Sequence, residues 1–514
     1  MASVLSKSQF FFLKNVSVLN TVKNTSIKNF TLASSTATRA SSSSVNSRVL
    51  SSASTISTGL LQRNFFSNAA FNAKRSSLRN FSTFSAFRTA QTVEPVVEQQ
   101  ARKRTLLNSS KWVGYWLIGT SGLVFGIVVL GGITRLTESG LSITEWKPVT
   151  GAIPPLNHQE WEEEFAKYKE SPEFKQLNSH ITLEEFQWIF FFEWAHRLWG
   201  RAIGVVMLLP AAYFVAKRKT TSRVNRRIFV LLLLLGLQGA IGWWMVKSGL
   251  DEKQLEERRS KPTVSQYRLT THLGAAFALY AGMIWTGFEI LRENKWIKDP
   301  KRSMELFQQL ENPALAPLRR IALGLVALTF ITAMSGGLVA GLDAGLIYNT
   351  FPHMGDDYVP SNRELFDETY ARKEDKSDLF WRNMLENPTT VQLNHRILAT
   401  TTFFTVLAVH MYAVRNKFII PRAAKKSVHA MMGVVSLQVT LGIFTLLYLV
   451  PIPLASAHQA GALALFTTSL IFAAQLRKPR TPIKILNASL YAQQLKKAQQ
   501  AGSKILTETS KLAK

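Results

Sequence analysis

The chain has 514 residues, of which 46% are hydrophobic, with no cysteine and a formal net charge of +28 at pH 7. The lack of cysteine excludes disulfides, thiolate metal sites and cysteine nucleophiles. So basic a chain is typical of nucleic-acid binding, of binding to an anionic membrane surface, or of a targeting segment. The distribution of the charge along the sequence discriminates among these three.

The first segment, residues 1–90, predicts a mitochondrial transit peptide. Lysine and arginine are spread through it, and the first acidic residue of the chain is Glu94. Serine, threonine and asparagine crowd stretches such as ASSSSVNSRVLSSASTIST. A basic, hydroxyl-rich and acid-free start is typical of an organelle import signal, which is excluded from fold reasoning. The alternative is a disordered basic tail.

Eight long apolar stretches follow. Each is long enough to cross about 30 Å of hydrocarbon at about 1.5 Å per residue. Backbone polar groups in lipid must be satisfied within the segment, so the stretches are predicted to be helices and the chain an all-α polytopic membrane protein. They are residues 112–133, 186–215, 228–246, 269–288, 321–342, 390–414, 428–450 and 453–476.

The loops between these stretches alternate in charge and predict the orientation. Loops 217–227 and 415–426 carry lysine and arginine without any acid, whereas loop 157–185 is rich in glutamate. The positive-inside rule places the basic loops and both termini on the inner side, which is the matrix for a mitochondrial inner-membrane protein. The outer loops 134–185 and 343–388 then face the intermembrane space.

An internal repeat divides the membrane region. Four short words recur in the same order, which predicts two tandem four-helix bundles, residues 112–290 and 318–477. A matrix linker, 291–317, joins them, and a matrix tail, 478–514, follows with a short amphipathic helix after Pro482. The matching words are GGITRLTESGL (131–141) with GGLVAGLDAGL (336–346), HRLWG (196–200) with HRILA (395–399), LQGAIG (237–242) with LQVTLG (437–442), and HLGAAFALY (272–280) with HQAGALALF (458–466).

The repeat places four histidines at equivalent points near the outer starts of the even-numbered spans: His196, His272, His395 and His458. Ionisable groups inside spans are functional hypotheses by default. A single one of these histidines would be interpreted as a core residue whose ring nitrogens are hydrogen-bonded. Four histidines at symmetric positions instead indicate metal ligands. A structural zinc would gather all four at one point. Paired histidines from facing helices suit haem, with one imidazole on each side of the iron. The simplest arrangement is one haem per half, held by His196 with His272 and by His395 with His458.

Arginines follow the first histidine of each half, at Arg197 and Arg396. A buried guanidinium needs an anionic partner, and haem propionates supply one with bidentate geometry. The alternative is pairing with a loop carboxylate or with interfacial lipid. Arg201 and Arg135 have no arginine at the equivalent position in the second half, so their roles are less constrained.

Glu193 distinguishes the two halves. It lies one helical turn before His196 and on the same face, whereas the equivalent residue before His395 is Gln392. A carboxylate in lipid is costly and is therefore protonated, paired or used in chemistry. We interpret the first half as the reactive site, with Glu193 as its catalytic residue, and the second half as an electron-transfer relative. The alternative is that Glu193 pairs structurally with a neighbouring arginine.

With these residues in view, the chain resembles the haem A synthase family, in its mitochondrial type, over about residues 112–477. The motifs that carry the resemblance are GGITRLTESGLSITEWKPVTGAIPP (131–155), EWAHRLWGR (193–201), TTHL (270–273), LNHRILA (393–399) and AHQAGALA (457–464). The family is similar in its eight helices, its twofold repeat and its four histidines. Many bacterial members carry a cysteine pair in outer loops, which this chain lacks.

The resemblance implies the reaction and its cofactors. Members of the family oxidise a ring methyl of haem O to a formyl group, giving haem A for cytochrome c oxidase, with a bound haem B. Carried over by position, His196 and His272 would hold the substrate haem beside Glu193, and His395 and His458 would ligate haem B. An electron donor is required, and a matrix ferredoxin system is expected. Candidate partners are haem O synthase, cytochrome oxidase assembly factors and a second copy of the chain; no nucleic-acid partner is expected.

A competing function is a di-haem b-type membrane cytochrome that only transfers electrons. It needs the same four histidines but no carboxylate in one half alone. An inverted-repeat transporter fits less well, because two four-helix halves begin on the same side of the membrane and no span looks broken at its centre.

Overall fold

The computed structural model describes residues 107–148, 150–258 and 260–512. The predicted transit peptide, residues 1–90, lies outside the described residues. Within them, eight helices are long and apolar enough to cross a membrane, which confirms the prediction of an all-α polytopic membrane protein. They are α3 (Lys111–Leu136), α5 (Leu183–Ala216), α6 (Ser222–Leu250), α8 (Gln266–Lys298), α10 (Ala316–Gly341), α13 (Pro388–Arg415), α14 (Arg422–Leu447) and α15 (Ile452–Leu476).

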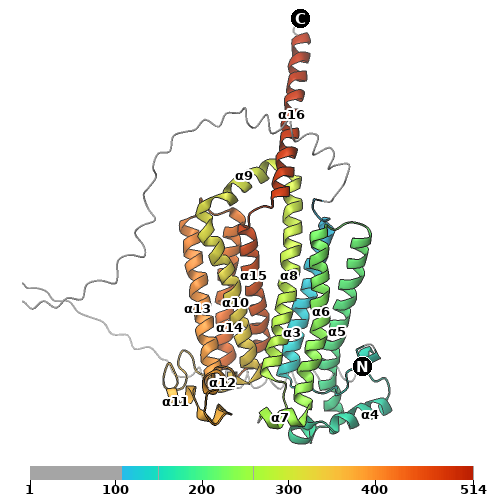
Figure 1. The fold of residues 1–514 in the computed structure, drawn as a ribbon, viewed down its shortest axis with the longest axis vertical. Coiled ribbons are helices and arrows are strands. Elements are labelled where there is room, and N and C mark those ends of the chain that lie inside the picture. The colour runs from blue at the N-terminus through green and yellow to red at the C-terminus, as the bar shows by residue number, and fades with distance from the viewer. Residues whose placement is uncertain (1–106, 149, 259, 513–514) are drawn as a thin grey trace, which may run out of the picture. The chain divides into compact units, whose positions relative to one another are not determined.

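Shorter helices lie outside the spans, at two opposite ends of the helix assembly (Figure 1). One end carries the long loops predicted to be outer, and the other carries the connection between the halves and the C-terminal helix. The helices of the first end are α4 (His158–Lys169), α7 (Glu252–Arg258), α11 (Asn362–Leu365) and α12 (Leu379–Glu386), and those of the second are α9 (Pro300–Glu311) and α16 (Thr481–Leu512).

The observed helix bounds differ from several predicted ones for identifiable reasons. The start of α5 is set by a capping box, in which the Thr182 side chain accepts from the backbone of Glu185 and the Glu185 carboxylate accepts from the backbone of Thr182. The end of α14 comes before residue 450 because Leu449 and Val450 adopt positive φ angles of 61° and 56°. The tail forms a 32-residue helix, α16, rather than a short one.

The spans of each half pack around one another. In the first half α3 contacts α5 and α8, and α6 contacts α5 and α8; in the second half α10 contacts α13 and α15, and α14 contacts α13 and α15. Helices α3 and α8 of the first half contact α15, and α8 also contacts α10. The division into two domains at residues 291–317 stays a prediction, since α8 continues to Lys298 and α9 occupies most of the predicted linker.

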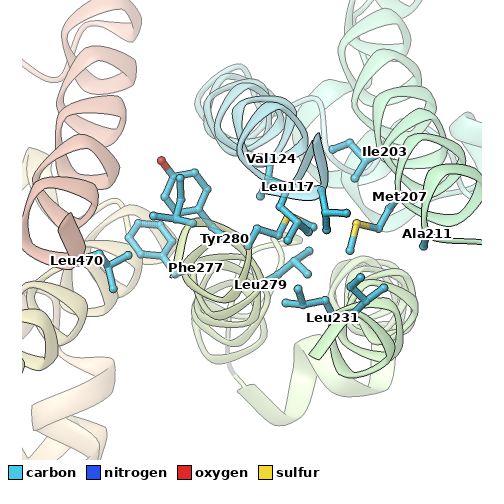
Figure 2. Packing of buried hydrophobic residues seen from close by; sticks show 14 of the residues in the cluster. Leu117, Val124, Ile203, Met207, Ala211, Leu231, Phe277, Leu279, Tyr280 and Leu470 are labelled. Atoms are coloured by element: carbon cyan, nitrogen blue, oxygen red, sulfur yellow. The ribbon is translucent and has the colours of Figure 1, made fainter. Parts of the chain in front are cut away.

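The main hydrophobic core lies among the first-half helices and reaches the second half through α15 (Figure 2). Leu117 of α3 and Met207 of α5 are completely buried in this core. Phe277 of α8 packs on Phe466 of α15 with ring centroids 5.3 Å apart. Apolar side chains outside the cavity lining, such as Leu233 and Leu323, stay exposed, as expected for helices that face lipid.

Candidate functional site

One large cavity, about 2110 Å³ in volume, lies between the spans and is lined by all eight of them. It extends through both halves. All four predicted histidine ligands line it, together with Glu193, Arg197, Gln392 and Arg396. The structure therefore brings the sequence-predicted site residues to one continuous space.

Each of the four histidines lies against a glycine of the preceding span in its own half. A β-carbon built at Gly131 would come 3.0 Å from Nε2 of His196, and one at Gly336 would come 3.1 Å from Cε1 of His395. The other two contacts repeat this pattern: the corresponding distances are 3.2 Å from Gly242 to Cε1 of His272 and 2.8 Å from Gly442 to Cε1 of His458. A β-carbon would push the imidazole back by a few tenths of an ångström at the first three glycines and by more at Gly442, so the absence of a side chain lets each ring pack directly on the preceding span.

The second glycine of each Gly-Gly pair contacts the other half of the molecule. A β-carbon at Gly132 of α3 would collide with the Gln459 side chain of α15, whose Nε2 donates to the backbone oxygen of Val128 at 3.0 Å. In the same way, a β-carbon at Gly337 of α10 would come 3.2 Å from the Leu273 side chain of α8. In each repeated Gly-Gly pair, the first glycine therefore packs against a histidine and the second contacts the other half of the molecule.

In the second half the two imidazoles lie close together. The ring centroids of His395 and His458 are 6.4 Å apart, and the ring planes are nearly perpendicular at 89°. An iron held between two imidazoles by bonds of about 2 Å requires ring centres roughly 6 Å apart. This pair therefore fits axial ligation of one haem iron.

A serine fixes the orientation of the His395 ring. The Ser335 hydroxyl donates to the backbone oxygen of Thr332 at 2.7 Å, and its oxygen lies 2.8 Å from Nδ1 of His395. Because the single hydroxyl proton is used by Thr332, Ser335 accepts from Nδ1–H, which leaves the lone pair of Nε2 free for a metal. The equivalent residue in the first half is Leu130, so this support exists for one half only.

The histidines of α8 and α15 are held through their backbone. Gln238 donates to the backbone oxygen of His272 at 3.1 Å, and Gln438 donates to that of His458 at 2.9 Å. The Nδ1 atoms of both imidazoles are buried and have no hydrogen-bond partner in the described part of the chain. Buried polar atoms without a partner are uncommon in folded proteins, and they are explained here if a ligand fills the cavity.

Glu193 is 3% exposed and accepts hydrogen bonds at both of its oxygens. Oε1 accepts from Arg197 at 2.6 Å, and Oε2 accepts from the Ser142 hydroxyl at 2.7 Å and from the backbone N–H of Ile143 at 2.8 Å. Arg197 also donates to the backbone oxygens of Ile143 and Glu145. The Glu193–Arg197 pair therefore fixes the loop after α3 over the cavity, and the pairing raised as an alternative from the sequence is present.

Gln392 occupies the equivalent place but bonds in the opposite sense. Its amide nitrogen donates to the backbone oxygens of Ala344 at 2.9 Å and of Tyr348 at 3.1 Å, while its oxygen accepts from Arg396 at 3.3 Å. The surroundings of Glu193 are thus built from donors, and the nearest partners of the Gln392 amide nitrogen are acceptors. The two halves are alike in shape but not in hydrogen bonding.

Three arginines that line the cavity each have a buried N–H donor without a partner among the described residues. Arg396 donates to backbone oxygens of the loop after α10, including that of Thr350 at 2.9 Å, yet its Nε is buried without a partner. Nε of Arg135 and Nη1 of Arg201 are likewise buried without partners among the described residues. Arg135 also joins the halves through an ion pair with Asp343 at 2.8 Å. The sequence left these two arginines without a role, because neither has an arginine counterpart in the repeat.

A second buried carboxyl lines the cavity and was not singled out from the sequence. Glu173 belongs to the loop after α4, is 4% exposed, and accepts from the Tyr168 hydroxyl at 3.0 Å. Burial above all, together with the nearby carboxylates of Glu193 and Glu138, raises the pKa of Glu173 to about 8 against the lowering effect of the Tyr168 hydroxyl. Only its place among seven other acids of an outer loop was visible in the sequence.

The remaining histidines lie elsewhere. His410 and His429 bond to each other, Nε2 to Nδ1 at 2.9 Å, away from the cavity lining. Within the part of the chain that the structure describes, no three histidine, aspartate or glutamate side chains gather as a metal-binding group. A single four-ligand zinc site is therefore not formed by the four histidines of the cavity.

Comparisons with known proteins show which family the chain is similar to. The family model described as "Cytochrome oxidase assembly protein" (COX15-CtaA) matches residues 114–470. Heme A synthase COX15 of Saccharomyces cerevisiae is 62% identical over 445 residues, which are 86% of this chain and 91% of the relative. Heme A synthase COX15 of Homo sapiens is 43% identical over 390 residues, 75% of this chain and 88% of the relative. The Heme A synthase-mitochondrial ferredoxin fusion protein of Schizosaccharomyces pombe is 49% identical over 401 residues, 77% of this chain and 65% of the fusion.

Proposed function

Because the chain belongs to the COX15-CtaA family of cytochrome oxidase assembly proteins, we propose that it acts as a haem A synthase in a mitochondrial membrane, which it crosses eight times. The proposed reaction is oxidation of a ring methyl group of haem O to a formyl group, which makes the chain an oxidoreductase. A di-haem cytochrome that only transfers electrons is not favoured, since the relatives named above are haem A synthases.

The observation that carries the proposal is the seating of four imidazoles, each on a glycine, in one cavity lined by all eight spans. A core histidine needs no such seat and no adjoining space. Two pairs of histidines with a shared cavity suit two haems, one as substrate and one as a resident group. The cavity is also mostly apolar, which suits the porphyrin ring.

We assign the second pair, His395 and His458, to haem B. The separation of 6.4 Å between their ring centroids and the tautomer imposed by Ser335 support this assignment. When bound there, haem B supplies electron transfer by its iron, and the chain sets its position and electrostatic surroundings. Arg396 closes this side of the cavity, and its unpartnered Nε is available to a propionate.

We assign the first pair, His196 and His272, to the substrate haem O. Arg201 and Arg135 line this part of the cavity and each has a buried donor free for a propionate, in addition to Arg197. These donors would fix the rotation of the porphyrin and so determine which ring methyl lies near Glu193. Gly131 and Gly242 keep the two imidazoles where they can hold the iron.

The role proposed for Glu193 is electrostatic. Its carboxylate is held in place by hydrogen bonds from Arg197, Ser142 and the backbone of Ile143. A fixed negative charge stabilises positive charge that develops at a carbon undergoing oxidation, and it costs no reorganisation at that moment. Gln392 cannot supply this charge in the second half.

The electrons are proposed to come from a ferredoxin on the matrix side. The fission yeast relative is named as a fusion of a haem A synthase with a mitochondrial ferredoxin. The positive-inside rule places the basic loops 217–227 and 415–426, and both termini, in the matrix of an inner-membrane protein. Haem O synthase, cytochrome oxidase assembly factors and a second copy of the chain stay predicted partners.

The test of this function is to supply haem O to the purified protein with a reducing system and to identify the extracted haems by chromatography and mass. We expect haem B together with haem O, a partly oxidised haem O or haem A. If only haem B is found and no product forms after haem O is supplied, the result would favour a di-haem cytochrome over a haem A synthase.

A further inference from the structure

A second hollow is lined by residues of α6, α8 and α15. Its volume is about 600 Å³. Arg223, Arg226 and Arg227, from the first turns of α6, form its charged end. The rest of the lining is mostly apolar and includes Val230 and Leu470. It is separate from the haem cavity and has no part in the proposed reaction.

The charged end carries more arginine than the neighbouring carboxylates neutralise. Arg223 and Arg227 lie 3.3 Å and 3.4 Å from the same oxygen of Glu289, which also pairs with Arg477. Arg226 is exposed and has no ion-pair or hydrogen-bond partner among the described residues. The excess positive charge therefore favours the binding of an anionic ligand.

The exposed side chains that follow Arg226 on α6 are apolar, so this side of the hollow is expected to face lipid. Val230, which lies four residues or about 6 Å along α6 from Arg226, is 59% exposed, and its neighbour Phe229 is 62% exposed. Cations at the membrane boundary with an apolar groove directly below them match a phospholipid, whose phosphate and acyl chain have the same order. A soluble acidic protein would leave this apolar groove unused.

We propose that the groove formed by α6, α8 and α15 binds one anionic phospholipid, with its phosphate at Arg226 and one acyl chain along Val230 and the partly buried Trp285. The repeat gives no such site in the second half. The positions equivalent to Arg223 and Arg227 are Ala423 and Ser427 there, and only Lys426 matches, at the place of Arg226. The site is therefore specific to the half that is proposed to hold the substrate haem.

The repeat also supplies the control for the test. The full chain is placed in nanodiscs of equal amounts of phosphatidylglycerol and phosphatidylcholine. The protein is then released from the nanodiscs, and the lipids that stay bound to it are counted by native mass spectrometry. Wild type should retain one phosphatidylglycerol in preference to phosphatidylcholine. Arg226→Gln should lower that retention about fivefold, since one cation at a membrane surface contributes about that factor. Lys426→Gln, in the equivalent exposed position, should leave it unchanged, and Arg226→Lys should restore it.

Because Arg226 has no partner among the residues that the structure describes, its replacement breaks no ion pair seen there and should not affect folding. Equal loss from Arg226→Gln and Lys426→Gln, or equal retention of the two lipids, would overturn the proposal. Inorganic phosphate in excess should not release the lipid, because the acyl chain contributes to binding; complete release by phosphate would make the site one for a free anion. Wild-type lipid retention by Arg226→Gln, with weakened binding of an acidic soluble protein instead, would assign the patch to a protein partner.

Discussion

Gly442 of α14 lies directly against the imidazole of His458 on α15, so that a β-carbon at this glycine would come 2.8 Å from Cε1 of the ring. The contact is closer than a real β-carbon tolerates, and His458 also has its backbone held by Gln438. A β-carbon at Gly442 would therefore push the ring out of its present position. The same pairing of a glycine with a histidine occurs for all four histidines, which makes it a property of the repeat rather than of one site.

Gly442→Ala should therefore lower the haem B content of the purified protein, by about tenfold if the effect equals that of other disturbed ligand supports. The haem B bound per protein, from absorbance and extraction, is the measurement. Gly433→Ala on the same helix is the matched control, since a β-carbon there meets nothing within 4 Å. Similar haem content in the two variants would show that the glycine contact does not determine the position of His458.

The two halves should respond differently to loss of a histidine. His395→Ala or His458→Ala should deplete haem B, because one axial imidazole is lost. His196→Ala or His272→Ala should leave haem B largely in place and end product formation. His410→Ala, outside the cavity, serves as a control for both. If all four cavity variants lowered the same haem equally, pairing within the halves would be wrong.

The hydroxyl of Ser335 should matter to the affinity for haem B. Ser335→Ala removes the acceptor of the Nδ1 proton of His395, and loss of such outer-shell partners typically costs about 10–100-fold in affinity. A titration of haem B into the apoprotein measures the effect. Ser436→Ala, whose hydroxyl bonds only to the backbone of Met432 in its own helix, should bind as wild type does. Unchanged affinity in Ser335→Ala would leave the serine with no role in ligation.

Stability should fall with rising pH because of Glu173. Burial raises the pKa of its carboxyl from an ordinary 4.5 to about 8, so the folded chain retains a proton that the unfolded chain releases between these values. Unfolding then becomes easier as pH rises through that window, by up to about 1.4 kcal/mol per pH unit, and the trend ends above pH 8. The midpoint of thermal unfolding in detergent at several pH values is the measurement.

Glu173→Gln should flatten this pH dependence, because the amide mimics the protonated carboxyl and still accepts from Tyr168. Glu170→Gln, an exposed acid three residues earlier, should leave the slope unchanged. A wild-type slope in Glu173→Gln would mean that another group titrates.

The sequence predicts the spans and the histidines for a general reason. Lipid forces each crossing segment to be a long apolar helix, and the repeat places equivalent residues at equivalent depths. The contacts that orient the site are less accessible to sequence reasoning. Ser335 stands beside a Gly-Gly pair that repeats, but it does not repeat itself, and Glu173 reaches the cavity only because an outer loop folds back over α5.

The comparison of Glu193 with Gln392 shows the same limit. From the sequence the two residues have similar shape and hydrogen-bonding capacity, and a swap between them appears mild. Their hydrogen-bond partners show that the swap is not mild. Glu193 accepts from donors at both oxygens, whereas the amide nitrogen of Gln392 donates to two carbonyls. Side-chain identity alone does not reveal the direction of the bonds around it.

The last prediction concerns Glu193→Gln. An amide at this position presents one oxygen to Arg197, Ser142 and Ile143, all of which donate, and its NH2 group faces donors in place of an acceptor. Some loosening of the loop after α3 is therefore expected, more than shape alone suggests. Haem B content should stay near wild type, because His395 and His458 are in the other half. Product formation should fall by about 10²–10³ if the carboxylate stabilises developing positive charge.

Two companion variants separate charge from loop anchoring. Ser142→Ala removes one donor to the carboxylate but keeps its charge and its bond to Arg197, so it should loosen the loop while retaining most activity. Gln392→Glu sets a carboxylate against the carbonyls of Ala344 and Tyr348, and it should not make the second half reactive, since its haem is not the substrate. The ratio of haem O to haem A extracted at equal protein decides among them. A haem A yield in Glu193→Gln equal to wild type, or equal losses in Glu193→Gln and Ser142→Ala, would give Glu193 a structural role, and the difference between the halves would then rest on Ser335 and the cavity arginines.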